Sequence, residues 1–349
     1  MQDPPANTGL IVKRAIAAAD NILGKLVNAG RVPGIAVGIN RNAEILLQKG
    51  YGHANLERGI KADPLDTLYR IASISKPIAA TALLYMVAEG RIDLDTSFYH
   101  YVPYFPRKKF DFTIRQLAGH TAGIRGYRGK EYGLNKPYSI RESLRLFQDD
   151  PLLFEPGQDF HYNSYGWVLI SLAIQEASGI PFSHYVHQKV LLPLGLGNTF
   201  PEVAAPRQQM AAFYTAYAGG FRPAIPVDNA YKLAGGGYLS TVADIVALGQ
   251  AYFGGKVGEP GLVSEFLSPG EAGGRPTYYG LGWEVSTDRG GRAYYGHTGN
   301  SVGACTLFRV YPSQDMVFTY LINCTNPGIT PRLEEVTEMV VDAVTTDGS

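Results

Sequence analysis

The sequence predicts an α/β fold in which both ends of the chain form one α/β unit and a mainly helical unit is inserted between them. Strand-like runs occur near both ends, whereas the middle of the chain has the apolar spacing of helices interrupted by loops. Three consecutive glycines, residues 235–237, mark the return to short β-rich segments. These observations place the α/β unit at residues 1–76 and 227–349 and the helical unit at residues 77–226.

The pattern of apolar residues and turn residues also predicts the individual elements. Helices are expected at residues 11–28, 73–89, 165–177, 182–194, 242–252 and 331–344. Strands are expected at residues 34–40, 44–50, 280–285, 293–297, 302–310 and 317–321. Gly30 and Gly90 end the first two helices, because a glycine readily adopts the left-handed conformation found at helix ends.

The composition indicates a folded protein with no electrostatic reason to bind nucleic acid. Of 349 residues, 45% are hydrophobic and 18% are charged. Lys plus Arg and Asp plus Glu both total 31, so the net charge is zero and nucleic-acid or anionic-membrane partners are not expected. No apolar run approaches the ~20 residues of a spanning helix. The polar start, residues 1–5, carries no secretory signal, which leaves the compartment open; a periplasmic or secreted location is favoured if a signal peptide has been removed.

The two cysteines, Cys305 and Cys324, lie in the two apolar runs of a predicted hairpin. Side chains alternate along a strand, so both cysteines are placed on one face and a disulfide is geometrically allowed. We expect two buried free thiols instead, since a free cysteine behaves as a small apolar residue.

The sharpest local motif is a serine and a lysine three residues apart at a predicted helix start, Ser73 and Lys76. Residues at i and i+3 share one face of a helix, so the hydroxyl and the amine can meet. A lysine whose pKa is lowered by burial can take the proton of a serine and make it a nucleophile. On its own the motif is also explained by a capping serine beside a surface lysine. Ser75 is the rival nucleophile, but it projects off the face that carries Lys76.

Two further motifs can serve the same chemistry. Tyr162 lies between a proline-glycine turn and a predicted helix, where a phenol can act as a general acid or base. His297, Thr298 and Gly299 lie between two strand-like runs, where a strand edge can offer backbone groups to an acyl substrate. Taken singly, Tyr162 is equally an ordinary half-buried tyrosine, and the histidine motif is equally a glycine-rich hairpin turn.

Taken together and in this order, the three motifs resemble the serine β-lactamase and penicillin-binding-protein superfamily. The likeness is greatest to the branch of class C β-lactamases, DD-peptidases and family VIII esterases. The pattern of that family is S-x-x-K, then Y-x-N, then K/H-T/S-G, which is matched here at residues 73–76, 162–164 and 297–299.

Three supporting stretches extend this resemblance. Residues 117–124, 234–241 and 279–283 are similar to the family's L-L-x-H-T-S-G-L, A-G-G-L-x-S-T and Y-G-L-G-W stretches. The likeness covers about residues 34–326, which is nearly the whole chain. It implies a β-lactamase/transpeptidase-like fold, with an antiparallel sheet flanked by helices and an active site in the groove between the sheet and the inserted helical unit.

The resemblance also implies a mechanism. Ser73, activated by Lys76 and Tyr162, attacks a carbonyl carbon and becomes acylated. The backbone N–H groups of Ser73 and Asn300 form the oxyanion hole. Water or another nucleophile then releases the acyl group, and neither a metal nor an organic cofactor is required.

The substrate-binding residues implied by the resemblance are Ser164, His297, Thr298 and Gly299, and two of them depart from the family pattern. Ser164 replaces the amide of Y-x-N, and a hydroxyl is shorter and donates one hydrogen bond only. His297 replaces the lysine of most β-lactamases, and a neutral histidine attracts a carboxylate less at pH 7. Both departures favour small esters or amides over peptides and β-lactams.

These features predict a serine hydrolase that acts on a small-molecule acyl substrate or a peptide. The first hypothesis is a β-lactamase-like carboxylesterase. The alternative is a D-Ala-D-Ala carboxypeptidase of the penicillin-binding kind or a β-lactamase. A non-enzymatic scaffold or a filament-forming member of the family is the third hypothesis, against which the retention of Ser73, Lys76 and Tyr162 argues.

Other patterns in the sequence have simpler interpretations. Residues 299–303 fit the G-x-S-x-G motif of α/β-hydrolases, but that motif needs a helix after it and a histidine downstream, and no histidine follows His297. His184 and His187 have helical spacing but no Cys, Asp or Glu cluster beside them, which predicts a surface pair and no metal site. His120, in a short polar loop, is expected to have a structural role.

Overall fold

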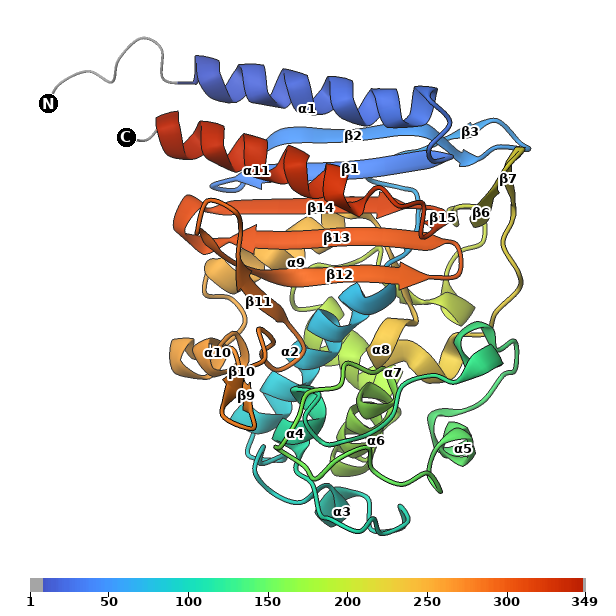
Figure 1. Ribbon diagram of the computed structural model, residues 1–349, viewed down its shortest axis with the longest axis vertical. Helices are drawn as coiled ribbons and strands as arrows, with labels where there is room; N and C mark the ends of the chain where they lie inside the picture. Colours follow the sequence, from blue (N-terminus) through green and yellow to red (C-terminus); the bar gives the residue numbers. More distant parts are fainter. Residues whose placement is uncertain (1–8, 348–349) are drawn as a thin grey trace, which may run out of the picture.

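The computed structural model describes residues 9–347, and a seven-stranded antiparallel sheet forms its upper half (Figure 1). The strand order is β11-β12-β13-β14-β1-β2-β3. These strands cover Glu284–Thr287 (β11), Ala293–Ser301 (β12), Ala304–Tyr311 (β13), Met316–Ile322 (β14), Gly34–Arg41 (β1), Glu44–Asn55 (β2) and Ile60–Lys61 (β3). Both ends of the chain build the sheet, because β14 pairs with β1 from Ile35↔Ile322 to Arg41↔Met316. The predicted antiparallel sheet is confirmed.

Side-chain alternation along the strands supplies two apolar cores, one on each face of the sheet. Phe318 and Tyr320 of β14 pack in one core with helices α1 (Leu10–Asn28) and α11 (Thr330–Asp347), which contact each other. Val317 and Leu321 point to the opposite face and pack in the core that includes α9 (Val242–Phe253). Helices therefore flank the sheet on both faces, as predicted (Figure 1).

The helices from the middle of the chain lie below the sheet (Figure 1). Two of them, α2 (Ser75–Ala88) and α6 (Tyr165–Ser178), bury most of their residues, and a helix that is apolar on all sides belongs inside a core. Both contact the short helix α8 (Leu233–Gly236). The 3₁₀ helix η1 (Ala72–Ile74) leads directly into α2, which puts Ser73 at the start of a buried helix.

The remaining elements are short and mostly belong to loops. The helices are α3 (Phe98–Tyr101), α4 (Ile114–Ala118), α5 (Ile140–Ser143), α7 (Phe182–Val186), α10 (Pro260–Phe266), η2 (Gly129–Gly133), η3 (Leu144–Leu146), η4 (His187–Leu191), η5 (Glu202–Ala204), η6 (Ala230–Lys232) and η7 (Pro312–Gln314). The strands are β4 (Tyr69–Arg70), β5 (Phe200–Pro201), β6 (Tyr214–Tyr217), β7 (Gly220–Pro223), β8 (Tyr238–Ser240), β9 (Glu271–Ala272), β10 (Arg275–Pro276) and β15 (Cys324–Thr325).

The strand expected at residues 280–285 begins late, at Glu284. The four residues before it form a tight turn in which the Gly280 N–H donates to the Trp283 carbonyl at 2.8 Å. Gly282 has a φ of 87°, and a side chain there would meet Trp167 and Ala80. The apolar run therefore belongs to a turn that packs on the core, which periodicity does not distinguish from a strand.

The helix expected at residues 182–194 is divided into α7 and the π-helical turn η4. The stretch expected to be mostly helical also contains a hairpin, β6–β7, whose strands pair from Tyr214↔Pro223 to Tyr217↔Gly220. The hairpin joins β15 near the end of the chain. The division into an α/β unit and a helical unit stays a proposal, since one apolar core runs from α6 to the sheet.

Three smaller predictions concern the cysteines, the start of the chain and membrane-spanning helices. Cys305 and Cys324 are buried free thiols in the same core, as predicted. Residues 1–5, on which the expectation about a secretory signal rests, lie outside the described residues. Within residues 9–347 no helix combines the length and apolar character needed to cross a membrane.

Candidate active site

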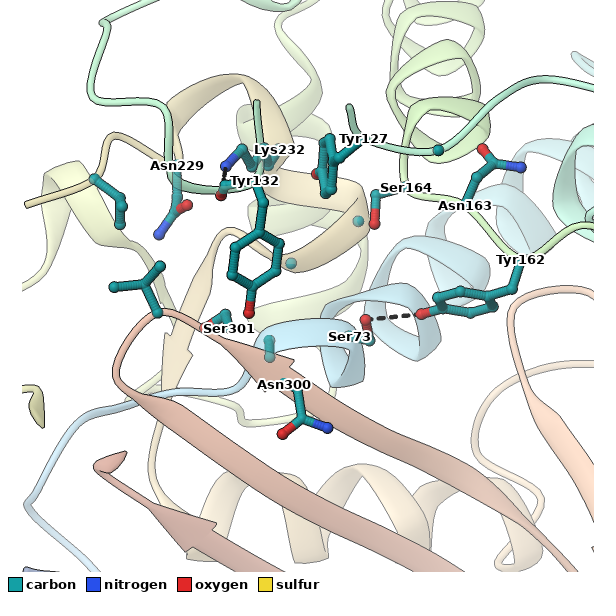
Figure 2. A pocket seen from close by; sticks show the side chains of 16 residues that line it. Ser73, Tyr127, Tyr132, Tyr162, Asn163, Ser164, Asn229, Lys232, Asn300 and Ser301 are labelled. Carbon is teal, nitrogen blue, oxygen red and sulfur yellow. Dashed lines mark hydrogen bonds between the residues drawn. The ribbon is translucent and has the colours of Figure 1, made fainter. Parts of the chain in front are cut away.

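The nucleophile predicted from sequence, Ser73, lies where η1 meets α2, with two polar side chains on its hydroxyl (Figure 2). Lys76 Nζ donates a hydrogen bond to Ser73 Oγ at 3.0 Å, and the Tyr162 hydroxyl donates one at 2.8 Å. The residue before it, Ala72, has a φ of 47°, a left-handed conformation that is uncommon for alanine and that clusters at functional sites. The structure thus brings together the serine and lysine paired by sequence spacing and the tyrosine implied by the resemblance.

The environment of Lys76 suits it to accept a proton. The side chain is fully buried, and Nζ donates a second hydrogen bond to the Gly235 carbonyl at 2.9 Å. Burial lowers the pKa of Lys76 to about 7, against the opposing attraction of the Glu284 carboxylate. At pH 7 a large share of the molecules therefore carries a neutral amine next to Ser73.

Tyr162 is placed to act as a neutral phenol. The residue is 39% exposed, but its hydroxyl group points at Ser73 (Figure 2). Loss of hydration raises the pKa of the Tyr162 phenol, and the charge of Glu284 raises it further, although the hydrogen bond to Ser73 acts in the opposite direction. Lys76 Nζ lies 4.7 Å from the centre of the Tyr162 ring, so the amine and the phenol are neighbours.

The free edge of β12 lies opposite Ser73. β11 pairs with β12 only as far as Gly296, so residues 297–301 of β12 extend beyond its end. This part of β12 contacts η1, and Asn300 and Ser73 line the same cavity. The arrangement suits the predicted oxyanion hole, in which the Ser73 and Asn300 N–H groups act together, and that role stays a prediction.

Gly299 allows β12 to approach the nucleophile closely. A side chain at this position would overlap Thr306 Oγ1 and place its Cβ 3.0 Å from both the Ala72 Cβ and the Ile71 carbonyl oxygen. These contacts are tighter than well-packed proteins accept, and two of them are backbone or rigid atoms. The glycine of the third motif is thus explained by packing of the strand on η1.

We expect Gly299→Ala to lower kcat/KM for ester hydrolysis at least about tenfold and to destabilise the fold by about 1–3 kcal/mol, because β12 must move away from Ser73. Ester kinetics and thermal unfolding measure the two effects. Gly197→Ala is the matched control, since nothing lies within 4 Å of a side chain there. Full activity in Gly299→Ala would show that the spacing between β12 and η1 does not matter for catalysis.

His297 is buried, and both of its ring nitrogens have partners. Nδ1 lies 2.6 Å from the Thr298 carbonyl oxygen, which requires N–H at Nδ1, so the Tyr279 hydroxyl donates to Nε2 at 2.9 Å. Burial lowers the pKa of His297 to about 4, and the charge of Lys76 also lowers it, while Glu284 opposes the shift. The ring is neutral at pH 7, so its 3.3 Å contact with Glu284 is not an ion pair.

The predicted role of His297 and Thr298 in substrate binding stays a prediction. The Thr298 hydroxyl donates to Glu284 Oε1 at 2.7 Å, and neither residue lines the cavity at Ser73. Glu284 was not found by sequence reasoning, because a single carboxylate after a tryptophan has no distinguishing spacing.

Ser164 and Asn163 have different roles at the start of α6. Ser164 lines the cavity, as expected for the third position of the Y-x-N pattern. Asn163 accepts a hydrogen bond from the Gly166 N–H at 2.6 Å and donates one to the His161 carbonyl at 2.9 Å. Its amide is therefore occupied with the backbone and does not substitute for the missing asparagine (Figure 2).

His120 supports the floor of the site. It is buried, its Nδ1 accepts a hydrogen bond from the Asn163 N–H at 3.3 Å, and its ring centre lies 4.5 Å from that of Tyr162. Burial lowers the pKa of His120, so the ring is neutral. These contacts agree with the expected structural role. His184 and His187 are exposed, as expected for a surface pair.

A cavity of about 190 Å³ opens beside Ser73. Tyr127, Tyr132, Val227 and Val302 supply much of its apolar wall, and Lys232 lies at its far end from Tyr162 (Figure 2). Sequence reasoning did not find these residues. They come from loops that are distant in sequence, so only the folded chain brings them together.

The residues 299–303 that fit G-x-S-x-G do not form a nucleophile elbow. They end β12 and enter β13 through a hairpin turn, with Ser301 paired to Ala304. No helix follows, which agrees with the expectation from sequence.

Comparison with other proteins gives a relative that covers most of the chain. The serine beta-lactamase-like protein LACTB, mitochondrial, of Homo sapiens is 28% identical over 413 aligned residues, covering 90% of this chain and 75% of the human protein.

Solved structures show the same fold. D-amino acid amidase from Ochrobactrum anthropi SV3, complexed with D-phenylalanine, superposes with a TM-score of 0.82 at 22% identity, covering 95% of this chain and 99% of the amidase. EstCE1, a hydrolase with promiscuous acyltransferase activity, superposes with a TM-score of 0.79 at 21% identity, covering 96% of this chain and 99% of EstCE1. The Beta-lactamase family model matches residues 19–336, and the chain therefore belongs to the beta-lactamase family.

Proposed function

We propose that this chain is a serine hydrolase that cleaves a carboxylic ester or amide through an acyl-enzyme on Ser73, and that it acts as a carboxylesterase. The observation that carries the proposal is the pair of hydrogen bonds that Ser73 Oγ accepts from Lys76 Nζ and the Tyr162 hydroxyl. A nucleophile within hydrogen-bonding reach of a base and an acid is what covalent catalysis requires. Family membership and the likeness to an amidase and a hydrolase support the same reaction class.

The proposed reaction begins with transfer of the Ser73 proton to neutral Lys76. Ser73 Oγ bonds to the carbonyl carbon, and the oxyanion is held by the N–H groups of Ser73 and Asn300. Tyr162 gives its proton to the leaving group and recovers one from Lys76, which leaves an ester of Ser73. Water then attacks this ester, with the same groups moving protons in the reverse sense, and Ser73 is regenerated.

Lys76 is the first base in this scheme, and Tyr162 is the acid. Burial has opposite consequences for the two groups, since it disfavours the charged form of each. It makes the neutral amine of Lys76 available near pH 7, where it can accept a proton. It makes a phenolate at Tyr162 less available, so the phenol is suited to donate.

The pH dependence tests this assignment. We expect kcat/KM for p-nitrophenyl butyrate to rise with pH through an apparent pKa near 7, because only neutral Lys76 accepts the Ser73 proton. Initial rates between pH 5 and 10, corrected with a Ser73→Ala blank, give the profile. A rate that is low at pH 8 and keeps rising beyond pH 10 would instead make the Tyr162 phenolate the base.

The site favours esters over substrates that present a carboxylate to the third motif. A neutral, buried His297 offers such a carboxylate no positive charge, and Ser164 offers one hydroxyl where an amide would bind a peptide-like acyl group. The second candidate, a penicillin-binding DD-peptidase or β-lactamase, uses the same acylation chemistry. It stays an alternative because Ser73, Lys76 and Tyr162 serve both.

A substrate panel separates the candidates. Purified protein is assayed with p-nitrophenyl esters of increasing acyl length, with a D-Ala-D-Ala peptide and with a fluorescent penicillin. An esterase hydrolyses the short esters and forms no lasting penicillin adduct. A stable penicillin adduct with slow ester turnover would contradict the esterase proposal and support the DD-peptidase. Failure to turn over or be acylated by any of them would support the non-enzymatic scaffold.

A further inference from the structure

A buried lysine lies in the cavity at Ser73 that the proposed reaction does not use. Lys232 is 5% exposed, and it lines the same cavity as Ser73 and Asn300. Figure 2 shows it on the side of Ser73 away from Tyr162. Because Tyr162 faces the leaving group in the proposed reaction, the Lys232 side of the cavity receives the acyl chain.

The ammonium group of Lys232 has no carboxylate partner. Among residues 9–347, no carboxylate oxygen lies within the 4.0 Å limit of an ion pair with Nζ. Nζ donates one hydrogen bond, to the Tyr132 carbonyl at 3.0 Å, and has two further N–H groups. The ring centres of Tyr127 and Tyr231 each lie 5.3 Å away, which attracts the cation but supplies no negative charge.

Two carboxylates act on Lys232 from nearby, Asp228 and Glu202, and each is engaged with other donors. Asp228 accepts a hydrogen bond from the Ala230 N–H at 2.9 Å. Arg70 donates to both carboxylate oxygens of Glu202, with Nε at 3.0 Å from Oε2, and the Asn229 amide donates to Oε2 at 2.8 Å. A buried cation without a direct ion-pair partner is costly, so such a group in an open cavity is suited to an anionic ligand.

The walls of the cavity define the rest of the ligand. Tyr127, Tyr132, Val227 and Val302 line the space that Ser73 and Lys232 share. An acyl chain that runs from Ser73 to Lys232 would be in contact with aromatic and branched apolar groups along its length and with an ammonium group at its end. Methylene groups and a terminal carboxylate meet these two demands.

We infer that Lys232 selects acyl groups that end in a carboxylate, so that the preferred substrates are monoesters or monoamides of dicarboxylic acids. This inference rests on the proposed Ser73 acyl-enzyme and adds its substrate class. Lys232 binds the distal carboxylate and is not one of the groups that move protons.

The charge state of Lys232 supports this role. Burial lowers the pKa of Lys232 to about 8; Arg70 lowers it further, while Asp228 and Glu202 oppose the shift. The group is mostly protonated at pH 7, so it can bind an anion there. A bound carboxylate would raise this pKa, because it favours the charged form.

The test compares two substrates that differ in one charge, mono-p-nitrophenyl adipate and its methyl ester. We expect wild-type kcat/KM to be at least about tenfold higher for the acid, the size expected of a hydrogen bond to a charged group. The preference should fall as the pH rises above about 8, when Lys232 loses its proton. Equal rates for the two substrates in the wild-type protein would overturn the inference.

Lys232→Gln removes the charge and keeps an N–H donor for the Tyr132 carbonyl. We expect it to lower the ratio of kcat/KM for the acid to kcat/KM for the methyl ester to about one. Lys130→Gln is the matched control, because Lys130 is an exposed lysine in η2 and does not line the cavity. An equal loss with both substrates in Lys232→Gln would show a structural role and would also overturn the inference.

A binding measurement keeps this result separate from the proposed function. Calorimetry with Ser73→Ala compares monomethyl adipate with dimethyl adipate in the presence and absence of the Lys232→Gln change. Preferential binding of the acid, lost in the double variant, supports the pocket assignment even if no ester is hydrolysed, in which case the proposed function alone fails. Ester hydrolysis without any preference for the acid in rate or binding overturns the inference alone.

Discussion

Ser73→Ala is expected to abolish covalent labelling by acylating reagents and to lower kcat/KM for ester hydrolysis by at least about 10⁴-fold. The hydroxyl of Ser73 is the only part of the side chain that the substitution removes, and it is the atom on which Lys76 and Tyr162 converge. Without it the carbonyl is attacked only by water. The oxyanion hole and substrate binding still accelerate this attack, and they determine the kcat/KM that remains in Ser73→Ala.

Ser75→Ala is the matched control for this prediction. Ser75 is the rival nucleophile of the same motif, but it is fully buried, and its hydroxyl accepts a hydrogen bond from the Tyr238 N–H at 3.3 Å. Its removal should leave labelling intact and change activity little. Labelling that persists in Ser73→Ala and disappears in Ser75→Ala would reassign the nucleophile.

Lys76→Met is expected to lower kcat/KM about 10³-fold, in the range measured for the loss of a general acid or base. Methionine is of similar length and is apolar, so it suits a fully buried position, whereas it cannot take a proton from Ser73. The hydrogen bonds of Nζ to Ser73 Oγ and the Gly235 carbonyl are lost with it. Steady-state kinetics and thermal unfolding separate the catalytic loss from any loss of stability.

Lys76→Arg distinguishes a base from a fixed positive charge. The guanidinium stays protonated at every pH used for the assay, so it can attract an oxyanion but cannot accept the Ser73 proton. We expect Lys76→Arg to be about as inactive as Lys76→Met, provided that unfolding curves show both variants folded. Substantial activity in Lys76→Arg at neutral pH would mean that Tyr162 or water is the base.

The sequence predicts much of the fold because its patterning is strong where the sheet and the large helices are built. The hairpin of β13 and β14 consists of apolar runs with a polar turn between them, and α2 and α6 are long apolar helical patterns. The pattern of apolar residues predicts strand at residues 280–283, because Leu281 and Trp283 continue into the run that ends at Val285. Only the turn geometry at Gly280 and Gly282 shows that they pack as a loop.

The catalytic side chains are also readable from sequence, since Ser73 and Lys76 share a helical face and Tyr162 belongs to a motif that follows in a fixed order. Their meeting across 89 residues is a tertiary contact that local patterns do not contain, and the family resemblance supplied it. Lys232 and Glu284 belong to no such pattern. Their importance comes from burial and from the charges around them, which exist only in the folded chain.

His297 illustrates a different limit of sequence reasoning. Its place in the third motif indicates a substrate contact, but the folded chain gives its two ring nitrogens to the Thr298 carbonyl and the Tyr279 hydroxyl. The sequence shows neither partner, because Tyr279 reaches the ring from a separate loop. A role in positioning β12 beside Ser73 is consistent with these bonds.

The most direct measurement of the central claim is intact-protein mass spectrometry of wild type, Ser75→Ala and Ser73→Ala, quenched with acid shortly after mixing with a p-nitrophenyl ester. We expect a mass increase equal to one acyl group in the first two proteins, with the label on the peptide that contains Ser73, and no increase in Ser73→Ala. Ester hydrolysis without any such adduct in the wild type, or an adduct that survives in Ser73→Ala, would contradict it.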